Sequence, residues 1–95
     1  MKRINHGYIQ LKIEKKWVFE HRLVVENFIK RELTKEEEVH HINGNKQNNS
    51  INNLMIFSNH SEHMSFEIYF KKYGFNQRAR RIISTRWSPY LLPNN

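Results

Sequence analysis

The stretch from Glu38 to His63 constrains the fold of this chain more than any other part of the sequence. A short apolar segment ends in two adjacent histidines, a loop rich in asparagine follows, and the apolar run Leu54–Phe57 leads to two more histidines. Asn43-Gly44 in the loop is typical of a tight turn, because glycine accepts positive φ and asparagine tolerates it. Four histidines around one loop indicate a metal site, a general base, or both.

The hydrophobic pattern of this stretch predicts the order strand, long loop, strand, helix. Strands are expected at residues 38–42 and 54–57, where short apolar runs are bounded by polar residues. The asparagine side chains of the loop can bond nearby backbone groups and so order a segment without regular structure. The helix is expected to start after Ser58 or Asn59 and to stop at Gly74.

The residues before this stretch predict a hairpin and one helix. Residues 7–13 alternate polar and apolar side chains, and residues 17–19 are strand formers that suit a return strand. Apolar side chains recur at helical spacing over residues 22–33, which predicts an amphipathic helix packed on the hairpin. Thr34 is placed to cap a short turn before the next strand. The expected fold is a small single α+β domain.

Length and composition narrow the possibilities further. Ninety-five residues allow one domain with one modest core. The chain has no cysteine, so any metal ion must be held by histidine, asparagine or carboxylate side chains. No apolar run is long enough to span a membrane and no signal peptide is visible, so we expect a soluble intracellular protein without a membrane partner.

The positive charge of the chain is concentrated at its C-terminal end. Residues 1–70 carry a net charge of +1, whereas residues 71–95 carry +6 and no acidic residue. This distribution indicates a polyanion binder, with a solubilising tail as the alternative. Trp87 and Tyr90 lie in this segment and can either stack on bases or pack against the fold. The candidate DNA contacts are Lys71, Lys72, Arg78, Arg80, Arg81 and Arg86, together with Arg22 and Lys46, for which a plain surface charge is the alternative.

We expect residues 1–74 to form one domain, with its functional core at about 38–73, and residues 75–95 to form a basic segment that contacts DNA. Within this segment, residues 77–83 could form a short helix. Ser88-Pro89 and Pro93 favour an extended end, because the residue before proline is biased away from helical geometry.

The adjacent histidines, His40 and His41, are expected to do different work. Neighbouring side chains of a strand point to opposite faces, so one could bind a metal ion while the other acts as a base. His63 and Glu67 lie one turn apart on the predicted helix and could hold a single ion from one face. His60 competes with His63 for that role, because it lies three residues earlier on the same helix.

Phosphodiester cleavage would use this combination of residue types. The reaction needs deprotonated water, stabilised charge at phosphorus and a neutralised leaving oxygen. A histidine with an ordinary pKa of about 6.5 is a suitable base at neutral pH, provided that a hydrogen bond fixes its tautomer. Asn53, near the start of the second strand, is the candidate for that hydrogen bond. A divalent cation on His40 and His63 would bind the phosphate.

The same residues resemble the HNH endonucleases, whose ββα-metal motif places two strands and a helix around one divalent ion. The likeness rests on the run from Val39 to Lys46, on Asn48-Asn49, on Asn53-Leu54 and on Ser61-Glu62-His63, and it covers roughly residues 7–67. The resemblance implies that His40 and His63 are metal ligands, that His41 is the general base and that Asn53 orients this base.

Two positions depart from the family pattern. Glu67 stands where many members have a second helix histidine, and Asn43 stands where aspartate is common. A carboxylate suits a hard cation, so Glu67 as a third ligand favours Mg²⁺ or Mn²⁺ over Zn²⁺ or Ni²⁺.

These inferences predict a divalent-metal-dependent endonuclease that nicks double-stranded DNA with little sequence specificity. The likeness to free-standing phage proteins implies a bacterial or phage setting, a role in homing or in genome packaging, and a second copy or a packaging protein as a further partner. The main alternative is a catalytically weak DNA-binding module whose metal is structural. An RNA-binding protein is the third hypothesis.

Overall fold

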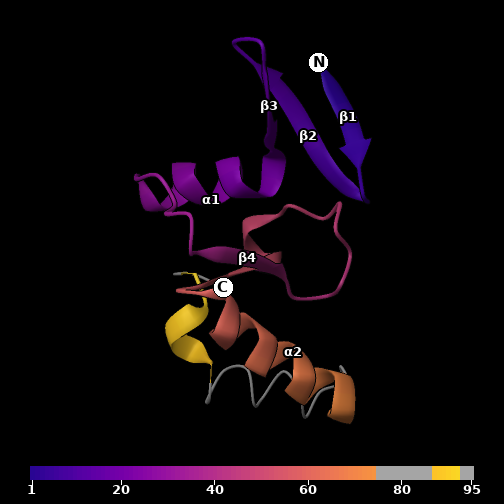
Figure 1. Ribbon diagram of the computed structural model, residues 1–95, viewed down its shortest axis with the longest axis vertical. Coiled ribbons are helices and arrows are strands. Elements are labelled where there is room, and N and C mark those ends of the chain that lie inside the picture. Colours follow the sequence, from indigo (N-terminus) through magenta and orange to yellow (C-terminus); the bar gives the residue numbers. More distant parts are fainter. Residues whose placement is uncertain (75–86, 93–95) are drawn as a thin grey trace.

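The chain folds into two small antiparallel sheets, each followed by a helix (Figure 1), which confirms the α+β class. The structure is a computed structural model that describes residues 1–74 and 87–92, without the side chains of Tyr73 and Ser88. The predicted helix at 77–83 lies outside the described residues. The elements are β1 (Lys2–Asn5), β2 (Tyr8–Ile13), β3 (Lys16–Phe19), α1 (Glu20–Ile29), β4 (Glu38–His41), η1 (Ile51–Asn53), β5 (Leu54–Phe57), α2 (His60–Tyr73) and η2 (Ser88–Tyr90).

The N-terminal sheet has three strands in the order β1-β2-β3, one more than the predicted hairpin. Strand β1 was not predicted, because its sequence is short, largely exposed and without clear alternation of polar and apolar residues. A two-residue turn joins it to β2, and both turn residues, His6 (φ 53°) and Gly7 (φ 85°), lie in the left-handed region that such hairpins require. Of the apolar side chains predicted to share one face of β2, Ile9 is buried and Ile13 is exposed.

Helix α1 begins two residues before the predicted start and ends four residues before the predicted end. It ends because Lys30 takes a left-handed conformation (φ 59°) and donates its backbone N–H to the carbonyl of Glu26. Leu33 therefore lies outside the helix, although it still packs against the core. Thr34 caps the next turn as predicted: its Oγ1 accepts from the Glu37 N–H, and its own N–H donates to the Glu37 carboxylate.

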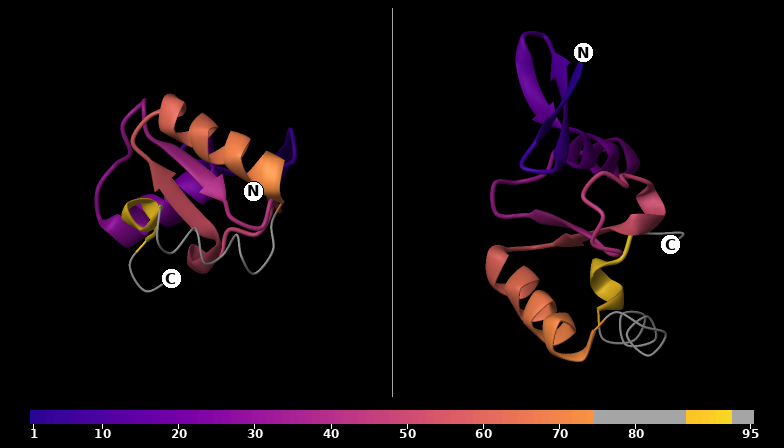
Figure 2. Two further views of the ribbon diagram at one scale, coloured as in Figure 1. Left: turned by 90° about the horizontal axis from the view of Figure 1, so that it is seen from below. Right: turned by 90° about the vertical axis from the view of Figure 1, so that its right-hand side faces the viewer.

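Strands β4 and β5 lie between α1 and α2 (Figures 1 and 2). Leu54 of β5 belongs to one hydrophobic cluster, with Val25 and Leu92, whereas Met55 and Phe57 belong to another, with Phe66 and Trp87. Alternation along a strand thus lets one short segment contribute to two cores.

Helix α2 follows its prediction closely. The Asn59 side chain accepts a hydrogen bond from the Glu62 N–H at the N-cap, and Gly74 (φ 77°) ends the helix. Phe66 is buried and Phe70 is half-buried beside it. Among the described residues, no helix combines the length and the apolar character that crossing a bilayer would need.

The aromatic residues near the C-terminus pack against the fold. Trp87 is buried, and its ring contacts Phe66 at a centroid distance of 5.0 Å, while Tyr90 lies 4.8 Å from Phe57. The extended conformation predicted for residues 88–89 is wrong, because Ser88–Tyr90 forms a 3₁₀ turn closed by the Tyr90 N–H and the Trp87 carbonyl. Of the two roles considered for these aromatics, the structure therefore supports packing.

We predict that Phe66→Ala destabilises the protein by about 3–5 kcal/mol, because it leaves a cavity among Phe57, Phe70 and Trp87. Urea unfolding followed by tryptophan fluorescence measures the loss. Ile68→Ala on the same helix is the matched control, since Ile68 is 64% exposed and its truncation should cost much less. Equal losses for the two variants would contradict this account of the core.

Candidate metal and catalytic site

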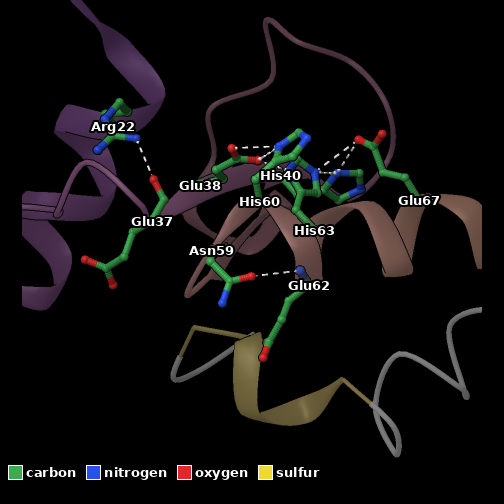
Figure 3. A network of polar contacts seen from close by, with 9 residues as sticks. All are labelled: Arg22, Glu37, Glu38, His40, Asn59, His60, Glu62, His63 and Glu67. Carbon is green, nitrogen blue, oxygen red and sulfur yellow. Dashed lines mark hydrogen bonds and ion pairs between the residues drawn. The ribbon is translucent and has the colours of Figure 1, made fainter.

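His40, His63 and Glu67 come together where the end of β4 meets α2 (Figure 3). His40 Nδ1 lies 3.0 Å from His63 Nε2 and 3.5 Å from a Glu67 carboxylate oxygen, which is itself 3.0 Å from His63 Nε2. The i,i+4 spacing on α2 places His63 and Glu67 on one face of the helix, as the sequence predicted. The structure therefore brings together all three of the expected metal ligands.

The spacing of these three atoms fits one shared metal ion. Ligand atoms about 2.1 Å from a metal are separated by about 3.0 Å in octahedral geometry and by about 3.4 Å in tetrahedral geometry. The observed separations of 3.0 to 3.5 Å cover this range. Two imidazoles and one carboxylate also form a donor set that divalent cations accept.

Glu38 distinguishes His63 from its competitor His60. The Glu38 carboxylate lies 2.7 Å from His63 Nδ1 and 3.0 Å from His60 Nδ1. Because the carboxylate accepts the Nδ1 proton of His63, the Nε2 lone pair is left to face His40 and Glu67. His60 contacts the Glu38 carboxylate but does not belong to the cluster of His40, His63 and Glu67, and its side chain is 71% exposed (Figure 3). The geometry thus selects His63.

The charge states in this cluster suit metal binding. Burial, together with the nearby His63 and His41, lowers the pKa of His40 to about 4. His40 is therefore neutral at neutral pH, which is the form that ligates a metal. Partial burial raises the pKa of Glu38, but hydrogen bonds from His63 and His60 outweigh this effect and hold that pKa below its usual range.

His41 points away from this cluster, as alternation along β4 requires. Its ring packs beside Tyr8 and His21 at centroid distances of 5.9 and 5.2 Å, and it is only 5% exposed. A hollow of about 110 Å³ nevertheless reaches both sets of side chains. Its lining includes His40, His41, Tyr8, Lys46, His63 and Glu67.

The structure corrects the predicted partner of His41. The side-chain amide that meets it is that of Asn49, whose Oδ1 lies 2.7 Å from His41 Nε2. Asn53 instead accepts from the Asn43 N–H and donates to the Asn43 side chain and the Asn48 carbonyl. Asn53 therefore holds the loop closed. The sequence pattern missed Asn49 because only the folded path of the loop brings it back to β4.

The asparagine-rich loop is ordered as predicted. Asn43, Asn45 and Asn48 each accept, through the side-chain oxygen, a hydrogen bond from the backbone N–H two residues later. These local turns replace the hydrogen bonds that regular secondary structure would supply. A long connection can thus present Asn49 at a defined position.

His21 is a buried neighbour of the site that the sequence did not single out. It is 8% exposed, and its Nδ1 is buried without a hydrogen-bond partner among the described residues. Burial lowers its pKa to about 4, and the nearby His41 and Arg22 act in the same direction. Only the tertiary contacts with Tyr8, Phe19 and His41 reveal this environment.

The candidate DNA contacts fall into four groups. Arg22 donates to the backbone carbonyls of Thr34 and Glu37 and so stabilises the turn before β4. Lys46 lies over the Tyr8 ring at 4.9 Å, and Lys71 lines a groove of about 420 Å³ that also reaches His40 and His41, so both are close to the site. Lys72 is exposed on the last turn of α2. The remaining candidates, Arg78, Arg80, Arg81 and Arg86, lie outside the described residues.

Two strands, a closed loop and a helix around a His-His-Glu cluster define the class of ββα-metal proteins. A comparison with known protein families matches residues 18–64 to the family described as HNH endonuclease. This segment of the chain, which holds His40, His41, Asn53 and His63, therefore belongs to the HNH endonuclease family, as its residues predicted. The family implies metal-dependent nuclease chemistry in general. Comparisons with curated proteins and with solved structures found no match.

We predict that Glu38→Gln weakens Mn²⁺ binding by about 10- to 100-fold, because a neutral amide accepts the Nδ1 proton of His63 more weakly than the carboxylate and can also present its NH₂ group instead. Titration calorimetry of Mn²⁺ into the folded protein measures the change. His60→Ala is the matched control, since it removes the other partner of Glu38 without touching the cluster. A loss of similar size in His60→Ala would show that His60 belongs to the site.

Acid should destabilise the fold through its buried histidines. The pKa of His21 is lowered to about 4, so between about pH 6.5 and pH 4 the unfolded chain binds more protons than the folded one. Stability therefore falls as the pH falls through this window, and His40 contributes in the same direction. The loss should be on the order of 1 kcal/mol for His21 after solvent screening.

His21→Phe tests this prediction, because it keeps an aromatic ring among Tyr8 and Phe19 and removes the titrating group. The difference in unfolding free energy between pH 7 and pH 5 should shrink in this variant. His60→Phe, at an exposed position, should leave that difference as in the wild type. An unchanged difference in His21→Phe would contradict the buried, neutral state of His21.

Proposed function

We propose that this protein is a divalent-metal-dependent endonuclease that hydrolyses phosphodiester bonds in DNA one strand at a time. The observation that carries the proposal is that two adjacent histidines of β4 point to different sides and meet different groups. His40 joins His63 and Glu67 in a cluster with metal-ligand spacing, and the next residue, His41, carries an imidazole of its own to the same hollow. Membership of the HNH endonuclease family supports this reaction class.

His40, His63 and Glu67 would hold the ion, and the carboxylate of Glu67 favours Mg²⁺ or Mn²⁺. When bound, such an ion supplies positive charge for the phosphate oxygens and the leaving oxygen. Glu38 fixes the orientation of the His63 ring, and the low pKa of His40 keeps that ring neutral.

His41 acts as the general base in this proposal. A neutral imidazole accepts the proton of the attacking water at near-neutral pH, provided that one ring nitrogen has a free lone pair. The rings of Tyr8 and His21 pack beside the His41 ring and hold it in place. Asn53 contributes indirectly, because it closes the loop that follows His41.

DNA is the substrate that the charge of the chain supports. Lys46 and Lys71 line the two depressions next to the histidines, and Lys72 follows on the same helix. These cations can contact the phosphates on either side of the cleaved bond without reading sequence, so we expect weak sequence specificity.

Plasmid nicking tests the proposal. Wild type, His41→Ala and His60→Ala are compared with Mg²⁺, Mn²⁺, Ni²⁺, Zn²⁺ or EDTA. We expect EDTA to abolish nicking, and His41→Ala to reduce the rate by on the order of 10²–10⁴ because the base is lost. His60→Ala controls for the loss of a histidine outside the site. DNA binding without cleavage by both wild type and His41→Ala would instead support a binding module with a structural metal.

A further inference from the structure

A chain of two hydrogen bonds connects His41 to a carboxylate on another element. Asn49 Oδ1 lies 2.7 Å from His41 Nε2, and Asn49 Nδ2 donates to Glu20 Oε1 at 2.8 Å. Glu20 is the first residue of α1, Asn49 lies in the loop and His41 ends β4. A helix, a loop and a strand therefore meet at one imidazole, and the helix residue lies far from the other two in the sequence.

The chemistry of these groups determines which atom carries each proton. A carboxylate oxygen only accepts, so the amide of Asn49 must turn its NH₂ group toward Glu20. Its carbonyl oxygen then faces His41 and can only accept, so the proton of the neutral imidazole must be on Nε2. The lone pair is consequently left on Nδ1. Without Glu20, the amide could rotate by half a turn and present its NH₂ group to Nε2 instead.

The surroundings of His41 make this control effective. The ring is 5% exposed and packs beside Tyr8 and His21, so water has little access to compete for Nε2. Asn49 is itself only partly exposed. One asparagine turn precedes it and a second, from Asn48 to Ser50, contains it, so its backbone is held in place.

We propose that Glu20 and Asn49 are positioning residues that set the tautomer of His41, so that Nδ1 is the nitrogen that receives the proton of the attacking water. The first part concerns the imidazole alone, whereas the second rests on the proposed function. Neither residue touches the substrate in this proposal. Each acts through the ring of His41.

Nuclear magnetic resonance tests the tautomer without any substrate or metal. Protein labelled with ¹⁵N at histidine is examined at alkaline pH, where imidazoles are neutral, and His41→Ala identifies the His41 signals by their loss. The wild type should show a protonated Nε2 and an unprotonated Nδ1. Asn49→Ala and Glu20→Gln should move both ¹⁵N shifts toward the average of the two tautomers. Glu32→Gln and Asn52→Ala, at exposed positions, should leave them unchanged.

A double variant exchanges the amide and the carboxylate between positions 20 and 49, and it should restore both hydrogen bonds. In Glu20→Gln/Asn49→Asp, the new carboxylate at position 49 accepts from the glutamine amide and from His41 Nε2, so the wild-type tautomer should return. Asn49→Asp alone places two carboxylates next to each other, so the contact between positions 49 and 20 should be weaker than in the double variant. Recovery in the double variant would exclude a simple loss of packing as the cause.

Nicking rates then connect the tautomer to catalysis. Glu20→Gln should lower the rate about tenfold or more, with little change in KM, and the double variant should recover it. An Nε2 that is unprotonated in the wild type, or a tautomer that Asn49→Ala and Glu20→Gln both leave unchanged, would overturn the proposal. Absence of nicking in the wild type would instead count against the proposed function, because the magnetic resonance result is independent of cleavage.

Discussion

The pairing of β4 with β5 is the constraint on which the site depends. His40 lies opposite Met55 and His41 opposite Leu54, so the register that buries these apolar partners also sends the two imidazoles to opposite faces. A shift of one residue would exchange the two histidines. Leu54 and Met55 belong to different hydrophobic clusters, and both clusters resist such a shift. Burial of apolar side chains thus holds the polar site in register.

Two histidines of the site are oriented by carboxylates, one directly and one through an amide. Glu38 accepts directly from His63 Nδ1 and leaves the opposite nitrogen of that ring facing the cluster. Glu20 reaches His41 through the amide of Asn49. In the proposed arrangement, this link places the proton of the His41 ring on Nε2 and leaves Nδ1 free. In each case the carboxylate comes from a different element than the histidine it meets or is linked to, so the charge states depend on the assembled fold.

Much of the fold could be predicted where local forces dominate. The capping bond of Asn59, the stop at Gly74, the bounds of β5 and the asparagine turns of the loop depend on residues within a few positions of one another. Prediction failed where distant contacts decide. Strand β1 forms by pairing with β2, and the 3₁₀ turn after Trp87 accompanies the burial of that side chain in the second sheet's core.

The sequence by itself determined which chemistry was available: two adjacent histidines at a strand end, a loop able to close, and a helix with His63 and Glu67 one turn apart. Strand and helix periods are local properties, so these relations survive without knowledge of the whole fold. Only the tertiary structure decided that Asn49 rather than Asn53 meets His41, and that His63 rather than His60 faces His40. The first choice depends on the path of the closed loop, and the second on the packing of α2 against β4. Neither is a local property of the sequence, because each depends on where the assembled fold places two separate segments.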